Sequence, residues 1–126
     1  MADVIDNIIE TGRGLIGKAK FSHDYRPPYS LDCSSFIYYI FLKNGINLGT
    51  IDDDLLFRLG KPVPLHDLQK GDLVFFNKNK GQNDITHVAL YIGNGQLLHM
   101  TNPRQNVIIN SLRTYMNYYV AAKRVL

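Results

Sequence analysis

The sequence predicts an α+β domain in which N-terminal helices pack against a central, mainly antiparallel sheet of about five strands. Apolar residues recur at helical spacing in the first half of the chain, whereas short apolar runs separated by turn residues follow one another in the second half. Helices followed by strands, without regular alternation, favour α+β over a parallel α/β sheet. With 126 residues and 45% hydrophobic content, the chain suits one core, so we expect a single domain over residues 1–126.

The first helix is expected to extend to about residue 18. Its apolar residues keep a mostly helical spacing at Val4, Ile5, Ile8, Ile9, Leu15 and Ile16, although Gly12 and Gly14 weaken the second half. The segment 22–30 contains Pro27-Pro28 and two tyrosines. We expect it to be an extended loop, because proline lacks a backbone donor and restricts the residue before it.

Two more helices are expected before the strands. From Cys33, apolar residues recur at three and four through Phe36, Ile37, Ile40 and Phe41, and Asn44-Gly45 supplies a C-terminal stop. Thr50 is then expected to cap a short helix that carries Asp52, Asp53 and Asp54 in its first turn and ends near Gly60. Cys33 therefore falls in the first turn of the second helix.

The second half of the chain contains five strand-like segments after the turn-rich residues 61–71. They cover residues 72–76, 87–92, 96–100, 107–110 and 119–125. The connection 77–86 is polar, with Lys, Asn and Gly, and is expected at the surface.

The hairpin around Asn94-Gly95 allows two registers. A two-residue turn pairs Leu90 with His99 and sends His87 through the opposite face of the sheet. A three-residue loop, or a bulge, instead pairs Ala89 with His99 and places both histidines on one face. That register also gathers Val88, Leu90, Ile92, Leu98 and Met100 on the other face. We therefore predict an odd-length loop or a bulge.

The lone cysteine, Cys33, is the main candidate for chemistry. One cysteine supports neither an intrachain disulfide nor a multi-thiolate metal site, so reactivity is the role to weigh against a small buried hydrophobe. A free thiol has a pKa of roughly 8.5, and the positive end of a helix with a nearby imidazolium can lower it to roughly 3.5 to 7.5. We expect both devices here.

His87 and His99 complete a candidate catalytic set. His87 is expected to pair with the Cys33 thiol and later to protonate the leaving amine, and His99 is expected to hold the other nitrogen of His87. A free backbone N–H at the start of the helix can stabilise an oxyanion. The combination favours acyl transfer through a thioester, although each histidine taken alone is equally compatible with an ordinary strand residue.

Other polar residues carry weaker expectations. Asp32 can cap the helix or bind substrate, and Ser34 and Ser35 are first-turn residues. His23 and His66 are expected at the surface, and the histidines and cysteine form no metal-ligand spacing, so we expect neither a metal nor a cofactor. The net charge of +3 comes from scattered residues, which argues against nucleic-acid binding.

The N-terminal residues 1–10 are acidic and amphipathic, without the basic start and apolar block of a secretory signal. No segment has the roughly 18 apolar residues that span a bilayer. We expect a chain that is cytoplasmic, exported without a Sec signal, or a mature or trimmed piece of a longer protein. The oligomeric state is open.

Three motifs together resemble the NlpC/P60 family of papain-like cysteine peptidases, which cleave the peptide stems of the bacterial cell wall. They are Asp32-Cys33-Ser34-Ser35-Phe36, Gly71-Asp72-Leu73-Val74-Phe75-Phe76, and His87-Val88-Ala89-Leu90-Tyr91-Ile92-Gly93-Asn94-Gly95 followed by Leu98-His99. Their order and spacing agree with the family from about Ser22 to Arg124.

The resemblance implies a papain-like NlpC/P60 fold with Cys33 as nucleophile, His87 as base and His99 as orienting residue. It implies hydrolysis of the bond between γ-D-glutamate and a diamino acid, diaminopimelate or lysine, in a stem peptide or muropeptide. Asp32 and Ser34 match positions that hold the free amino end of the stem, and Tyr25, or else Tyr29, matches a tyrosine that does so.

The sequence departs from the family pattern in two places. Ser35 stands where the family usually has glycine, and Tyr25-Arg26-Pro27-Pro28-Tyr29 replaces a double-glycine approach to the cysteine motif. Neither change removes Cys33, His87 or His99. The alternatives are another thiol-dependent amidase or acyltransferase on the same fold, or a catalytically silent module that binds wall peptides.

Overall fold

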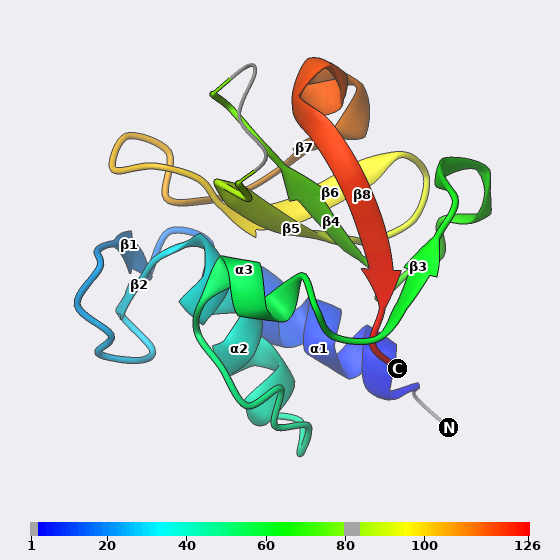
Figure 1. Ribbon diagram of the computed structural model, residues 1–126. Helices are drawn as coiled ribbons and strands as arrows, with labels where there is room; N and C mark the ends of the chain where they lie inside the picture. Colours follow the sequence, from blue (N-terminus) through cyan, green and yellow to red (C-terminus); the bar gives the residue numbers. More distant parts are fainter. Residues whose placement is uncertain (1–2, 80–83) are drawn as a thin grey trace.

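A six-stranded antiparallel sheet with helices on one face organises the protein (Figure 1). The computed structural model describes residues 3–79 and 84–126. Its elements are α1 (Val4–Arg13), β1 (Lys20–Phe21), β2 (Ser30–Leu31), α2 (Cys33–Leu42), α3 (Asp53–Leu56), β3 (Lys61–Val63), η1 (Leu65–Asp67), β4 (Leu73–Phe76), β5 (His87–Tyr91), β6 (Gln96–Met100), β7 (Val107–Ser111), η2 (Leu112–Tyr118) and β8 (Tyr119–Arg124). The strand order is β3-β8-β4-β5-β6-β7, which confirms the predicted α+β class.

Helix α1 begins at the N-cap Asp3, whose side chain accepts a hydrogen bond from the backbone of Ile5. It ends at Arg13, so the prediction of a helix to about residue 18 is wrong. Residues 14–17 form turns, in keeping with the two glycines in this stretch. Gly12 lets α1 approach the core closely: a Cβ there would lie 2.7 Å from Leu98 Cδ2.

Helix α2 is fixed at its start by a capping box. Asp32 accepts a hydrogen bond from the backbone N–H of Ser35, and the Ser35 hydroxyl accepts one from the backbone of Asp32. Phe36, Ile37, Ile40 and Phe41 are fully buried, as predicted, and pack with the inner face of the sheet. The first turn of α2, with Cys33, is therefore held firmly relative to β5 and β6.

Helix α3 is capped by Asp52 rather than by Thr50. The Asp52 carboxylate accepts from Leu55 N, while the Thr50 hydroxyl accepts from the backbone of Asp52 one step earlier. The helix ends at Leu56 and not near Gly60. Aspartate accepts the capping bond as well as threonine does and also carries charge favoured at a helix start, which explains why the cap lies two residues later.

Two short pairings were missed by the sequence pattern. Strand β3 pairs with β8 at the edge of the large sheet, where Pro62 is tolerated. Strands β1 and β2 form a separate parallel pair, Lys20↔Ser30 and Phe21↔Leu31, so the segment expected as a loop over 22–30 ends in a strand. Strands this short present too few residues for alternation to be visible.

The register of the β5–β6 hairpin is the one predicted. Leu90 pairs with Leu98 and Tyr91 with Leu97, which leaves the odd-length loop Gly93-Asn94-Gly95. All three loop residues have positive φ, at 90°, 54° and 71°. This conformation suits glycine and asparagine and closes the hairpin through Ile92 N–H to Gln96 O.

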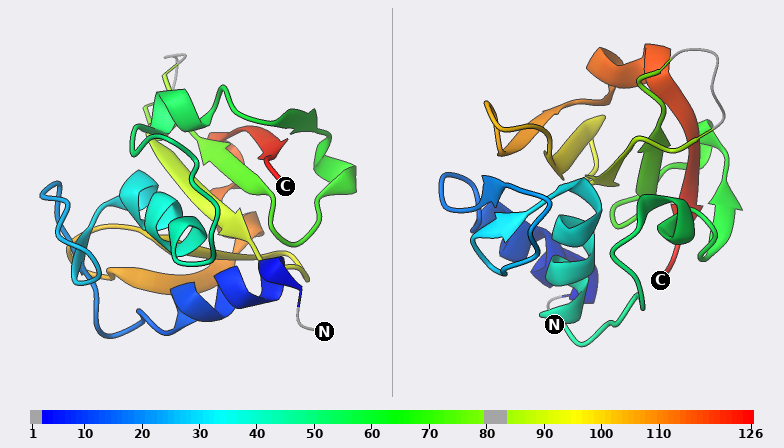
Figure 2. Two further views of the ribbon diagram at one scale, coloured as in Figure 1. Left: turned by 90° about the horizontal axis from the view of Figure 1, so that it is seen from below. Right: turned by 60° about the vertical axis from the view of Figure 1, so that its left-hand side comes forward.

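The two faces of the sheet are sorted as expected. Val88, Leu90, Leu98 and Met100 join the helices in the larger core cluster. Ala89 and Leu97 belong to a second cluster on the other face, where η2 contributes Tyr115 and Tyr118. The right-hand view in Figure 2 shows the helices on one side of the sheet and the orange-red η2 segment on the other.

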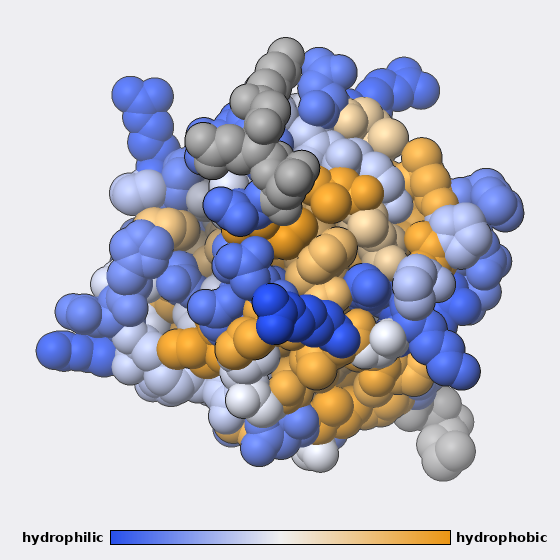
Figure 3. Space-filling view, in the orientation of Figure 1, coloured by the Kyte–Doolittle hydropathy of each residue, from blue (hydrophilic) through white to orange (hydrophobic). Residues whose placement is uncertain are grey.

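The surface is partly hydrophilic (Figure 3), and the described residues at the centre of the connection 77–86 are exposed. In Figure 3 the side around β1 and β2 is mostly hydrophilic, and hydrophobic side chains gather where the helices meet the sheet. Lys78, Asn79 and Asp84 in the connection 77–86 are exposed, as expected, while residues 80–83 lie outside the described part of the chain. Within that described part, none of the helices combines the length and apolar character of a bilayer span.

Candidate active site

Cys33 and His87 line one cavity of about 280 Å³ at the junction of the helical layer and the sheet. Cys33 is partly exposed in the first turn of α2, and His87 is the first residue of β5. The cavity is lined by Phe21, His23, Asp32, Cys33, Ser34, Ile51, Asp52, Asp53, Lys78, Thr86, His87 and Thr101. The packing of α2 on β5 thus joins two residues that are far apart in sequence.

The thiol lies near the backbone of β5. The N–H groups of Val88 and of Ser34 act on the thiol and favour its charged form. Val88 directly follows His87 in β5, so the sulfur lies near the histidine's own strand.

A chain of hydrogen bonds runs away from the thiol across three strands. His87 Nε2 lies 2.7 Å from His99 Nδ1, and His99 Nε2 lies 2.7 Å from Asn110 Oδ1. His87, His99 and Asn110 belong to β5, β6 and β7, which are neighbours in the sheet. Since Nε2 of His87 is engaged by His99, Nδ1 is the ring nitrogen left for Cys33.

Aromatic packing shields the hydrogen-bonded histidine pair, His87 and His99, from water. His87 is 2% exposed and His99 is fully buried. The ring of Tyr115, from η2, stacks on His87 at 6.2 Å and meets His99 edge-on at 5.2 Å. The ammonium of Lys78 lies 5.4 Å from the centre of the Tyr115 ring. The histidine pair is therefore held between the sheet and η2.

The thiol's pKa differs from the sequence-based expectation. Burial, with smaller contributions from the carboxylates of Asp32 and Asp53, raises the pKa of Cys33 to about 11, although the backbone N–H of Val88 acts in the opposite direction. The expected fall to roughly 3.5 to 7.5 is therefore wrong for this arrangement. A helix start lowers a thiol's pKa only where burial and nearby carboxylates do not outweigh it.

The two histidines are held neutral. Burial lowers the pKa of His87 well below its usual value, and the charges of its neighbours act in the same direction. Burial also lowers the pKa of His99 to about 4, although the hydrogen bond that His99 makes to Asn110 Oδ1 tends to raise it. The site therefore contains a protonated thiol beside a neutral imidazole at neutral pH, and His87 is available as a base.

Asp32 has the capping role that the sequence allowed, and it also faces the cavity. Burial tends to raise its pKa, but hydrogen bonds from Ser35, His23 and Ser34 outweigh this and leave the pKa low. The His23 ring, exposed as predicted, lies 3.2 Å from Asp32 Oδ2. Ser34 lines the cavity, while its hydroxyl donates to the carbonyl oxygen of Ile51 at 2.6 Å.

Neither upstream tyrosine joins the lining of this cavity. Tyr25 is half-buried and packs edge-on against Tyr38 at 6.1 Å, whereas Tyr29 is 64% exposed. Of the two, Tyr25 is the one held by the core. The cis bond between Pro27 and Pro28 lies between them, in the segment that departs most from the family pattern.

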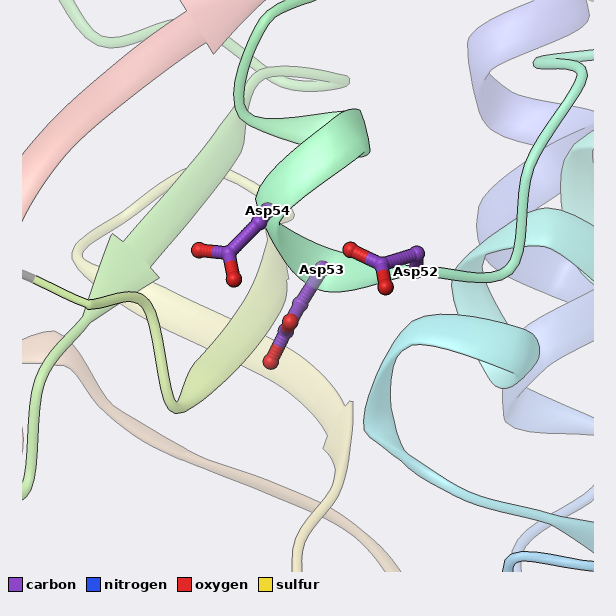
Figure 4. Close-up of side chains that lie close together, drawn as sticks. All are labelled: Asp52, Asp53 and Asp54. Carbon is purple, nitrogen blue, oxygen red and sulfur yellow. The ribbon is translucent and has the colours of Figure 1, made fainter.

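Three consecutive carboxylates fan out from the start of α3 (Figure 4). Asp52 and Asp54 are exposed, and their carboxylates accept hydrogen bonds from the backbone of Leu55 and Ile85, respectively. Asp53 differs, because it is half-buried and lines the cavity with Cys33. Burial and the neighbouring Asp54 raise the pKa of Asp53 to about 6.

A larger, more open hollow of about 640 Å³ lies elsewhere, between η1, η2 and the β5–β6 loop. Leu65, Leu68, Tyr91, Arg113 and Met116 are among the residues that line it. It contains neither the thiol nor the histidine pair. The smaller cavity, which has both Cys33 and His87 in its lining, is therefore the candidate active site.

Sequence reasoning missed Asn110, Tyr115 and Lys78 as neighbours of the histidine pair. The pairing of β6 with β7 could have revealed Asn110. In that register Asn110 lies opposite Leu97, and therefore diagonal to His99 on the same face. Tyr115 and Lys78 come from η2 and from the β4–β5 connection. Their positions depend on how those segments fold back, for which no periodic pattern exists.

Comparison with known proteins agrees with this geometry. The family model described as the NlpC/P60 family matches residues 17–125. The γ-D-glutamyl-L-lysine dipeptidyl-peptidase of Bacillus cereus is 34% identical over 123 residues, covering 96% of this chain and 36% of that protein. The enzyme of the same name from Bacillus subtilis is 36% identical over 107 residues, covering 85% of this chain and 36% of that protein.

The fold has a solved counterpart. A crystal structure of an NlpC/P60 family protein from Bacillus cereus superposes with a TM-score of 0.89 at 32% identity, covering all of this chain and 41% of that one. The chain thus spans little more than a third of the length of the two dipeptidyl-peptidases it matches. The family match, the shared fold and these relatives together identify the chain as a member of the NlpC/P60 family.

Proposed function

We propose that this chain is a cysteine peptidase that hydrolyses peptidoglycan stem peptides at the bond between γ-D-glutamate and a diamino acid. The observation that carries the proposal is the placement of Cys33 and His87 in one cavity, with His87 held by His99 at 2.7 Å. A nucleophile, a base and a group that orients the base are the parts that thiol-dependent acyl transfer needs. The proposed catalytic residues are Cys33, His87 and His99.

In the proposed reaction, Nδ1 of His87 takes the proton of the Cys33 thiol as sulfur attacks the carbonyl carbon of the substrate amide. The tetrahedral intermediate collapses to a thioester when the imidazolium of His87 protonates the leaving amine. Water, deprotonated by His87, then attacks the thioester and releases the acid and the free thiol. Since the pKa of Cys33 is about 11 and that of His87 is low, proton transfer accompanies attack and does not precede it.

The oxyanion of the intermediate needs a preorganised donor. The first N–H groups of a helix have no acceptor within the helix, and Cys33 is the first residue of α2. Its backbone N–H is our choice for that donor, since the attacked carbonyl must lie beside Sγ. The positive end of α2 supports the same charge.

The substrate assignment draws on the relatives and on the charge of the cavity. Two relatives are named as γ-D-glutamyl-L-lysine dipeptidyl-peptidases. The cavity also carries the ionised carboxylate of Asp32, which suits the free amino end of a short stem. Ser34 and Tyr25 are proposed to help hold that end, Ser34 from within the cavity and Tyr25 from the loop beside it.

The test is digestion of purified cell wall and of a defined series of stem tripeptides and tetrapeptides, analysed by mass spectrometry. Freshly reduced wild type should release fragments that end in γ-D-glutamate, and Cys33→Ala should release none. Cleavage of the amide bond between the lactyl group of the glycan and the stem peptide would instead establish an amidase on the same fold. No cleavage of any stem by the reduced wild type would overturn the proposal in favour of a silent binding module.

A folding control belongs to the same experiment. Cys33→Ser keeps the size of the side chain and the capping box of Asp32 and Ser35, so its unfolding midpoint should match that of wild type. Loss of cleavage with an unchanged midpoint assigns the effect to the nucleophile. Cleavage retained in both Cys33 variants would show that another group attacks the substrate.

A further inference from the structure

A neutral histidine that orients another histidine has two tautomers, whereas a carboxylate in the same place only accepts hydrogen bonds. Neutral imidazole carries its proton on either Nδ1 or Nε2. If His99 carries it on Nε2, its Nδ1 accepts a hydrogen bond from His87 Nε2–H, and Nδ1 of His87 is free to act as a base. If His99 carries it on Nδ1, the bond reverses and the proton of neutral His87 lies on Nδ1, where it blocks proton transfer from Cys33.

Nε2 of His99 contacts Asn110, a side chain that can select one of these tautomers. Asn110 Oδ1 lies 2.7 Å from His99 Nε2. In the β6–β7 register Leu97 pairs with Asn110 and His99 with Ile108, so Asn110 lies on the face of His99, one diagonal away. An amide oxygen only accepts hydrogen bonds, and therefore requires the proton of His99 to be on Nε2.

We propose that Asn110 is a positioning residue that fixes the tautomer of His99 and, through it, the base form of His87. The inference rests on the proposed thiol peptidase function and deepens it. Asn110 acts at the far end of the hydrogen-bond chain and not on the substrate. It adds a fourth member, borne by β7, to the set Cys33, His87 and His99.

The surroundings explain why a neutral acceptor is suited to this place. Among the described residues, Lys78 and Tyr115 face the histidine pair from other elements. The other titratable groups that line the cavity with His87 are His23, Asp32, Cys33, Asp52 and Asp53. A carboxylate at position 110 would stabilise the charged forms of both histidines, whereas an amide selects a tautomer without adding charge to a buried pair. The imidazole of His87 then stays neutral over a wide range of pH.

The direct test is NMR of uniformly ¹⁵N-labelled protein at pH 7, in which long-range proton–nitrogen correlations report which ring nitrogen of each histidine is protonated. Wild type should show Nε2–H for both His87 and His99. Asn110→Leu, close in size and without an acceptor, should lose the Nε2–H tautomer as the dominant form of His99. Wild type with His99 protonated on Nδ1 would overturn the proposal.

The kinetic test uses Asn110→Leu and Asn110→Asp with a stem peptide substrate. Asn110→Leu should lower kcat by about tenfold with KM unchanged, the effect of one lost hydrogen bond. Asn110→Asp retains an acceptor and should restore kcat at alkaline pH, with the acid limb of its pH profile moved up by roughly one unit. A uniform loss of activity in both variants, without a shifted profile, would indicate a structural role and overturn the proposal.

Controls separate this result from general damage and from failure of the proposed function. Ile109→Val alters the opposite face of β7 and should leave both the tautomers and kcat as in wild type. The NMR experiment needs no substrate. If wild type cleaves no stem peptide, the proposed function fails, while the tautomer spectra and the rate of Cys33 alkylation by iodoacetamide still decide whether Asn110 positions the pair.

Discussion

The backbone N–H of Val88, the second residue of β5, acts on the thiol of Cys33 in the first turn of α2 and favours the charged form of the thiol. It does not make the thiol acidic, because burial raises the pKa of Cys33 to about 11. In the proposed mechanism, proton transfer therefore depends on the neutral base His87.

Alkylation of Cys33 should report the raised pKa directly. Without substrate, the rate of reaction with iodoacetamide should still be rising at pH 10, because the thiolate is the reactive form. The rate is measured by mass spectrometry of the intact protein, and the single cysteine makes the reading unambiguous. A plateau reached below pH 8 would mean that the thiol is ionised near neutral pH and would contradict this prediction.

Removal of the base should abolish turnover without unfolding the protein. His87→Ala is expected to lower kcat for stem cleavage by about 10²- to 10⁴-fold, the usual contribution of a positioned acid or base. His66→Ala is the matched control, since His66 is exposed in η1, and it should behave as wild type. Wild-type kcat in His87→Ala would remove His87 from the proposed mechanism.

Stability should fall as the pH is lowered from about 6.5 to about 4. The pKa of His99 is about 4 in the folded protein and about 6.5 when unfolded, so the unfolded chain binds more protons in this window. Stability is therefore highest above pH 6.5, and His99 alone accounts for a loss on the order of 3 kcal/mol by pH 4. Urea unfolding followed by circular dichroism at several pH values measures it.

His99→Gln should reduce that dependence, because the titrating group is removed, and His66→Gln should leave it unchanged. A free energy of unfolding that is flat between pH 4 and 6.5 in wild type would show that the histidine pair is not held neutral.

The two roles of Asp32 can be separated by one substitution. Asn caps a helix about as well as Asp, so Asp32→Asn should keep the melting temperature. It loses the negative charge, and KM for a stem with a free amino end should rise about tenfold. An N-acetylated stem is the control, since its KM should not respond to the substitution. Equal effects on both stems would assign Asp32 to capping alone.

Two glycines near the end of α1, Gly12 in its last turn and the C-cap Gly14, should respond oppositely to alanine. At Gly12 a Cβ would lie 2.7 Å from Leu98 Cδ2 and 3.1 Å from Phe36 Cζ, both fully buried, so Gly12→Ala should cost about 1 to 3 kcal/mol. Gly14 has helical φ and ψ, and a Cβ there makes ordinary contacts. Gly14→Ala should be neutral or stabilise by up to about 1 kcal/mol. Urea unfolding of both variants compares them.

The sequence predicts most of what local pattern and pairing control. The helical spacing of the buried residues Phe36, Ile37, Ile40 and Phe41 predicted α2. The sorting of side chains in the hairpin predicted that His87 and His99 lie on the same face of the sheet. Short elements escaped, as β3 did, because Lys61–Val63 offers no alternation to detect.

The electrostatics of the site could not be predicted in the same way. The pKa of Cys33 depends on how deeply the thiol is buried and on Asp53, a residue 20 positions away whose side chain reaches the cavity only when α3 folds back over α2. A sequence shows the helix start that favours a thiolate but not the desolvation that opposes it.

The loop Gly93-Asn94-Gly95 decides more than the shape of a turn. Because alternate residues of a strand face opposite sides, deletion of one loop residue would rotate β6 so that His99 points among the helices, while His87 stays where it is. Members of this family that lack one residue here would need a compensating change in β6 to remain active. Under the proposed mechanism, loop length has to be considered together with the residues of β6 when the same histidine pair is sought in a related sequence.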